Sequence, residues 1–193
     1  RFTHHDNGHY ESYFLRANHP SRPLAFWIRY TIFAPRGDAG GNIGELWVIA
    51  FDGENDRIQA AKAEYPLAQC QFDNGGLNVR IGSATLEPGK LQGSVQQGGN
   101  HIQWQLSYQP GAEPLLLLPA SLYDKPLPKA KALVANPNAV FSGQLIVNGE
   151  ILPVDHWQGS ENHNWGSKHT DEYAWGQVRS EERRVGKECR SRW

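Results

Sequence analysis

Residues 24–33 read LAFWIRYTIF, a run rich in aromatic and β-branched residues whose side chains alternate between two faces, as in a β-strand. One face would hold Phe26, Ile28, Tyr30 and Ile32, and the other Trp27, Arg29, Thr31 and Phe33. Both faces carry large apolar groups, so we expect both to be partly covered. The turn-rich stretch PRGDAGG at 35–41 leads to GELWVIAF at 44–51. These segments predict a β-hairpin in the wall of a sheet.

Further short strand-like segments follow along the chain. They lie at 9–17, 68–72, 77–82, 84–87, 90–96, 100–108, 115–118, 129–135, 139–147 and 150–154, with Asn148-Gly149 as a hairpin turn before the last. Residues 56–64 contain good helix formers but also alternate, and their strand-like neighbours favour a strand. This pattern predicts an all-β sandwich or antiparallel barrel. A barrel that encloses one small ligand is favoured, because the strand number is near the roughly eight that leave such an interior.

Length and composition limit the classes of protein. The 193 residues suffice for one well-buried domain and are too few for two comfortable ones. The formal net charge is −1 and no basic stripe is present, so no nucleic-acid partner is predicted. No segment approaches the roughly 18 apolar residues of a membrane span. A cytoplasmic or membrane-associated location, with peripheral membrane contact, is the expectation.

Both ends of the sequence look artificial. The chain begins at Arg1 and contains no methionine, so we expect a start codon and any signal peptide to lie upstream. Residues 180–193, SEERRVGKECRSRW, resemble the translation of a sequencing adapter and are excluded from the fold prediction as a non-native tail. Cys70 is then the one remaining cysteine, which excludes an internal disulfide.

The densest group of chemically useful residues lies at 155–176, which read DHWQGSENHNWGSKHTDEYAWG. This stretch combines acids, histidines, asparagines and tryptophans with almost no aliphatic residue. Acid, base, amide and flat aromatic groups together are what a pocket needs to protonate or orient an apolar substrate. We therefore predict a site here.

The run WQGSENHNWG at 157–166, preceded by Phe141-Ser142-Gly143 and the Asn148-Gly149 hairpin, resembles the lipocalin-like superfamily of carotenoid 1,2-hydratases (hydroxyneurosporene synthases). Tocopherol cyclases and lipocalin-like Diels–Alderases are more distant relatives in that resemblance. It implies a lipocalin-like antiparallel β-barrel over 1–155, followed by a motif segment at 156–179 that leads into a truncated second barrel. It also implies a hydratase or cyclase that acts on an isoprenoid-like, hydrophobic small molecule without an organic cofactor.

The resemblance implies catalysis by a His-Asn-Trp-Gly segment, which maps onto residues 163–166. The acidic and phenolic partners that the hydratases carry further downstream fall in the region missing from this fragment, and Asp171 and Tyr173 only look like them. Adding water to an isolated alkene requires a strong proton donor, a dry cavity and a positioned water. We expect Asp155 or Asp171 to be the donor and His163 to hold the water or take its proton. The predicted substrate-binding residues are Trp157, Asn162, Asn164, Trp165, Tyr173 and Trp175.

Each of these residues has an alternative structural role. His163 could satisfy backbone groups, Trp157 and Trp165 could be core, and the two aspartates could be turn or loop residues. A metal site from His156, His163 and His169 is a further alternative, but no tight ligand spacing supports it and none is predicted. An enzyme and a non-catalytic lipocalin-like binding module both stay open. A carboxylic acid facing the cavity beside His163 would favour the enzyme, and aspartates pointing to water would favour the binding module.

Overall fold

The computed structural model describes residues 8–35, 37, 41–73 and 75–167, which form one antiparallel sheet of twelve strands. The strands are β1 (His9–Asn18), β2 (Leu24–Ala34), β3 (Ile43–Asp52), β4 (Arg57–Pro66), β5 (Cys70–Phe72), β6 (Val79–Ile81), β7 (Ala84–Glu87), β8 (Lys90–Gln97), β9 (Asn100–Gln109), β10 (Leu115–Leu116), β11 (Ala130–Val147) and β12 (Glu150–Gly166). Two short 3₁₀ helices, η2 (Leu67–Gln69) and η3 (Ala120–Leu122), interrupt them. Within the described residues, no helix has the length and apolar character needed to cross a membrane.

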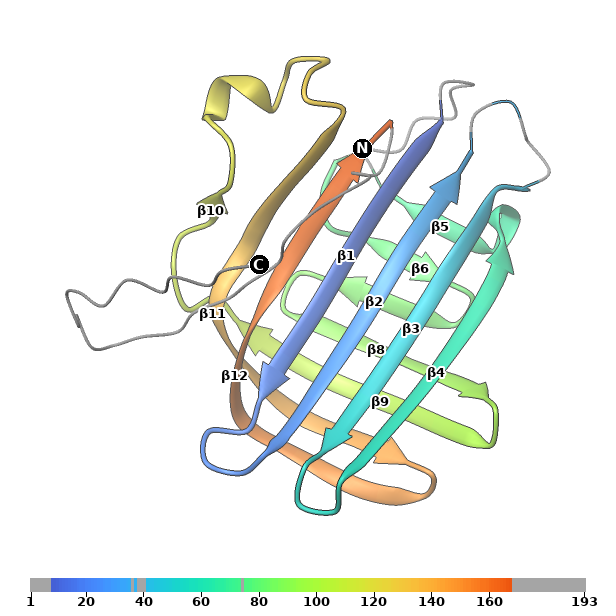
Figure 1. The fold of residues 1–193 in the computed structure, drawn as a ribbon, viewed down its shortest axis with the longest axis vertical. Helices are drawn as coiled ribbons and strands as arrows, with labels where there is room; N and C mark the ends of the chain where they lie inside the picture. The colour runs from blue at the N-terminus through green and yellow to red at the C-terminus, as the bar shows by residue number, and fades with distance from the viewer. Residues whose placement is uncertain (1–7, 36, 38–40, 74, 168–193) are drawn as a thin grey trace, which may run out of the picture.

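The sheet curls into a nearly closed barrel. Its strands lie in the order β4-β3-β2-β1-β12-β11-β9-β8-β7-β6-β5, and β10 pairs with β11. Strands β5–β9 cross behind β1–β4 (Figure 1). Side chains tie the edge strand β4 to the β8–β9 hairpin: Gln97 Oε1 accepts from the Lys62 N–H at 2.8 Å, and Asn100 Nδ2 donates to the Ala60 carbonyl at 3.0 Å. The predicted all-β barrel is confirmed.

The hairpin predicted from residues 24–51 is formed by β2 and β3. The even-numbered residues of β2 point inward, and Phe26, Ile28 and Tyr30 are each at most 1% exposed. Three of the outward residues, Trp27, Arg29 and Phe33, are less covered, and Phe33 is 44% exposed, whereas the outward Thr31 is buried. Two-residue alternation therefore holds along this strand, with the barrel interior as its dry side.

Large aromatic side chains fill the middle of the barrel. Trp157, Phe26 and Phe141 are almost fully buried, and Phe26 contacts the other two rings at centroid distances of 6.1 and 5.4 Å. Deeper along the barrel, Trp104 Nε1 donates to the Tyr30 hydroxyl at 3.0 Å. Burying each large apolar side chain contributes roughly 1.5–3 kcal/mol, so this cluster is a main source of stability.

Strands β11 and β12 form a long hairpin around the predicted turn, where Asn148 and Gly149 both have positive φ. The segments predicted at 129–135 and 139–147 are one continuous strand, and the segment predicted at 150–154 continues as β12 to Gly166. This difference arises because β11 pairs with β12 along its length and β1 pairs with it from Gln158 to Gly166, so the later part of β12 has its backbone groups satisfied on both sides. The predicted strand over 56–64 is confirmed as β4.

Candidate functional site

The candidate site lies at the end of the barrel where β1 begins and β12 ends. In the β1–β12 ladder, Glu11 is opposite Trp165 and Tyr13 is opposite His163. Directly opposite residues in an antiparallel ladder project to the same face, so these four side chains share the inner wall. The two strands are neighbours in Figure 1 although they come from the two ends of the described chain.

Glu11 and His163 form a buried pair, which we call the Glu11–His163 dyad. His163 Nε2 lies 2.8 Å from Glu11 Oε1, and the two side chains are 11% and 2% exposed. The Tyr13 hydroxyl donates to the same carboxylate oxygen at 3.0 Å, and His9 Nε2 lies 3.0 Å from Oε2. The carboxyl group therefore has a polar partner on each oxygen although it is almost fully removed from water.

Aromatic rings fix the orientation of the His163 imidazole. It stacks on Tyr13 with ring centroids 4.1 Å apart and planes 5° apart, and on Trp165 at 4.4 Å and 20°. Trp165 in turn stacks on Tyr123 at 5.7 Å. Two nearly parallel rings at such distances cannot occupy one side of the imidazole, so His163 lies between them. The stack leaves the ring little freedom to rotate.

The surroundings of Glu11 favour its ionised form. Burial alone would raise the pKa of the Glu11 carboxyl, but the hydrogen bonds from His163 and His9 and the charge of His163 hold this pKa well below its usual range. A carboxylate can only accept hydrogen bonds, so Nε2 of His163 carries a proton in both the imidazolium and the neutral ring, and the neutral ring has its lone pair on Nδ1. This arrangement suits a general base that needs a fixed tautomer.

The predicted asparagines lie on the other face of β12. Asn162 and Asn164 are opposite Phe14 and Ser12, whose side chains point away from the barrel interior. The Asn162 amide donates to the Phe14 carbonyl at 3.3 Å and to Ser160 Oγ at 3.0 Å. The structure does not bring these two side chains to His163.

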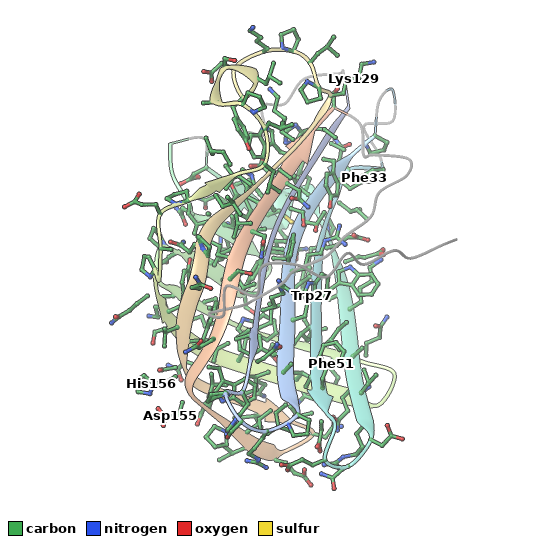
Figure 2. All side chains as sticks on the ribbon, turned by 60° about the vertical axis from the view of Figure 1, so that its left-hand side comes forward. Trp27, Phe33, Phe51, Lys129, Asp155 and His156 are labelled. Atoms are coloured by element: carbon green, nitrogen blue, oxygen red, sulfur yellow. The ribbon has the colours of Figure 1, made fainter. Side chains whose placement is uncertain are left out.

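Asp155 lies at the far end of β12 from His163. Its side chain is 86% exposed and lies 2.6 Å from Nδ1 of His156, which is also exposed. Figure 2 shows both residues pointing out of the barrel. Asp155 and His163 are eight residue steps apart, a distance of roughly 26 Å along the strand. The structure thus keeps Asp155 away from the dyad.

The other predicted residues divide into two groups. Trp165 stacks on His163, as described, whereas Trp157 is 1% exposed and packs in the core against Phe26. Asp171, Tyr173 and Trp175 lie outside the described residues, as does His169. Among the described residues, no group of three or more His, Cys, Asp or Glu side chains could hold a metal ion.

Glu11, Tyr13 and His9 were not predicted as site residues. A signal for them was present, because HYESY at 9–13 alternates and places all three on one face. The pairing of β1 with β12 was the missing information, since Glu11 and His163 are 152 residues apart in the chain.

A surface hollow of about 360 Å³ lies away from the dyad, over β8, β9 and β11. Its walls are mainly uncharged amides and hydroxyls, with Gln92, Gln103, Gln105, Gln144, Ser94 and Ile146 among the lining residues. It holds no titratable side chain, so we assign the chemistry to the dyad.

The chain was compared with known families, curated proteins and solved structures. No family model matches the chain. It is 25% identical over 172 residues to an uncharacterized protein of Mycobacterium tuberculosis strain H37Rv, and equally to one of strain CDC 1551. Each match covers 87% of this chain and 48% of the relative, so the chain spans about half the length of the curated relatives it matches.

Two crystal structures are similar in three dimensions. A candidate AttH protein from Nitrosomonas europaea has a TM-score of 0.59 at 16% identity, over 88% of this chain and 54% of its own. The protein CghA, solved with Sch210972, has a TM-score of 0.56 at 12% identity, over 83% and 46%. Both fit a lipocalin-like barrel. At such identities the likeness shows the fold alone, and the resemblance to carotenoid hydratases and tocopherol cyclases stays a prediction.

Proposed function

We propose that this chain belongs to an enzyme that adds a proton to an alkene of an apolar, isoprenoid-type substrate, in the manner of a hydratase or cyclase. The observation that carries the proposal is the Glu11–His163 dyad. Burying an ionised carboxylate costs several kcal/mol unless it is paired and hydrogen-bonded. A module that only holds an apolar ligand has no need of such a group, whereas proton transfer does.

The dyad supplies the base of such a reaction. His163 Nδ1 takes a proton from the water that adds to the carbocation, while the Glu11 carboxylate stabilises the imidazolium that forms. The Tyr13 and Trp165 rings flank His163, and an aromatic face stabilises a nearby cation by roughly 0.5–2 kcal/mol. Burial keeps bulk water from capturing the cation at random.

The experiment uses the protein at its full natural length, because the chain spans about half of its relatives. It is incubated with an acyclic carotenoid or a prenylated quinol in heavy water. We expect deuterium in a hydrated or cyclised product, with a loss of about 100-fold or more in rate for His163→Ala. His156→Ala is the matched control, since the exposed His156 side chain pairs only with Asp155 among the described residues, and it should keep the wild-type rate.

A lipocalin-like binding module for a hydrophobic small molecule is the second candidate. The exposure of Asp155 favours it, because that aspartate cannot be the buried donor. Ligand binding without any label in wild-type protein would establish this second function and exclude the first.

A further inference from the structure

A second buried carboxyl group lies on the same inner wall as the dyad. Glu161 is 3% exposed and precedes His163 by two residues on β12, so both side chains project from one face. Two strand residues separate their Cα atoms by about 7 Å. The two groups are therefore near neighbours on the inner wall of the barrel.

Asn136 reaches Glu161 because β11 contains an extra residue at this point. Val134 is opposite Asn162 and Asn136 is opposite Glu161, which leaves Ala135 without a partner in the ladder. In a regular ladder Ala135 would oppose Glu161, and Asn136 would face outward. The bulge therefore turns the Asn136 amide toward the buried acid, as bulges beside functional sites do.

The hydrogen bonds to Glu161 end on one of its two oxygens. The Tyr108 hydroxyl donates to Oε2 at 2.9 Å, and Asn136 Nδ2 donates to the same atom. Among the described residues, Oε1 has no hydrogen-bond partner. A neutral Glu161 therefore carries its acidic proton on Oε1, where no side chain of the described barrel competes for it.

Burial favours this neutral form. It raises the pKa of the Glu161 carboxyl by more than the hydrogen bonds from Tyr108 and Asn136 lower it. Glu11 is shifted in the opposite direction, and two carboxyl groups whose pKa values are driven apart suit an acid and a base partner. The titratable groups that face the interior around Glu161 are Tyr108 from β9, Tyr30 from β2, Tyr13 and Glu11 from β1, and His163 on β12 itself.

We propose that Glu161 is the proton donor of the reaction, a role that rests on the function proposed above. The Glu161 Oε1–H bond breaks as the alkene π electrons form a new C–H bond, which leaves a carbocation and a Glu161 carboxylate. The oxygen of a water molecule bonds to the cation and releases a proton to His163 Nδ1. A proton returned from the imidazolium to the carboxylate through solvent restores both groups.

The first test is Glu161→Gln in the full-length protein, with the substrates and heavy water used for His163. We expect a fall of about 100-fold or more in the rate of deuterium incorporation, with ligand affinity unchanged. Glu113→Gln is the matched control, since Glu113 is an exposed carboxyl outside the strands, and it should retain the wild-type rate.

Tyr108→Phe separates a donor role from a structural one. The Tyr108 hydroxyl stabilises the Glu161 carboxylate, so its removal should raise the pKa of the acid further. The alkaline limb of the rate profile should then move to higher pH while activity persists at lower pH. An unmoved limb would contradict the proposal, because a merely structural Glu161 leaves that limb where it was.

Two results would overturn the donor role. The first leaves the proposed function intact, and the second can be measured without any enzymatic activity. Label incorporation that survives Glu161→Gln but is lost in His163→Ala excludes Glu161 as the donor and leaves the dyad in place. In wild-type protein at neutral pH, infrared spectra should show the carbonyl band of a neutral carboxylic acid that disappears in Glu161→Gln. The absence of that band excludes the role directly, whereas a wild type that adds no label to any substrate defeats the proposed function itself.

Discussion

Glu11 and Glu161 are the same kind of side chain, but the protein shifts their pKa values in opposite directions. Both are buried, and burial raises the pKa of both. The difference lies in the partners: Glu11 is surrounded by two histidines and a phenol, while Glu161 has a phenol and a neutral amide. Two copies of one side chain on one wall thus have their pKa values shifted in opposite directions.

These shifts predict opposite dependences of stability on pH. The folded pKa of Glu11 is lowered, so its stabilising contribution is present above about pH 4.3, its unfolded pKa, and is lost as the pH falls through the folded value. The folded pKa of Glu161 is raised, so its contribution is largest below about pH 4.3 and declines as the pH rises through the folded value. Each slope is at most about 1.4 kcal/mol per pH unit.

Urea unfolding of Glu11→Gln and Glu161→Gln between pH 3 and pH 8 measures both effects. Relative to wild type, Glu161→Gln should gain stability as the pH rises, and Glu11→Gln should gain stability as the pH falls below about 4.3. Parallel curves for the two variants would contradict the opposite shifts.

At the scale of elements, β11 departs from regular pairing in three places opposite β12. The third departure, between Phe141 and Gly143, has a glycine with φ of +134°. A Cβ atom there would lie 2.2 Å from the Gln105 carbonyl oxygen on β9. Glycine is therefore required by the backbone conformation and by the close approach of a neighbouring strand.

Gly143→Ala should lower the free energy of unfolding by about 2 kcal/mol or more, because it adds backbone strain and a contact with a main-chain atom. Gly75→Ala is the control, since a Cβ at Gly75 meets no atom within 4 Å. Urea denaturation compares the two variants. A loss at position 143 no larger than that at position 75 would show that the strands can separate to admit a methyl group.

The prediction of elements from sequence succeeded where side chains alternate between a dry and a wet face. The β2–β3 hairpin and the Asn148-Gly149 turn needed only local information. The end of β12 could not be predicted, because HNWG contains no apolar alternation and its strand conformation depends on two partners. Once residues 157–166 are known to form a strand, its two-residue period alone places Asn162 and His163 on opposite faces.

At the scale of the whole molecule, the interior divides into an aromatic core and the polar groups near one end. Trp157 was predicted to bind substrate, with a core role as the alternative, and it packs among the core aromatics. The pairing of Glu11 with His163 and the surroundings of Glu161 could be recognised only in the closed barrel, because the partners of these residues come from β1, β9 and β11. The sequence alone could therefore predict only the site residues that lie on β12.

Trp157→Ala should therefore cost about 3–5 kcal/mol of stability, as for other fully buried tryptophans. Trp27→Ala, at an outward and partly exposed position of β2, should cost clearly less. Thermal or urea unfolding of both variants provides the comparison. Trp157→Phe should retain catalysis in the label assay, and a selective loss of activity without a loss of stability would instead place Trp157 against the substrate.

The position of β1 between β2 and β12 also affects how the protein is made. On the ribosome β2 emerges directly after β1 and can pair with it, but the β12 partner is about 150 residues away. At about 5–20 residues per second, one edge of β1 stays unpaired for roughly 8–30 s of synthesis. During that interval the nascent chain presents an open hydrogen-bonding edge to chaperones and to neighbouring chains. Among the described strands β12 is made last, so the candidate site forms only when β12 seals this edge.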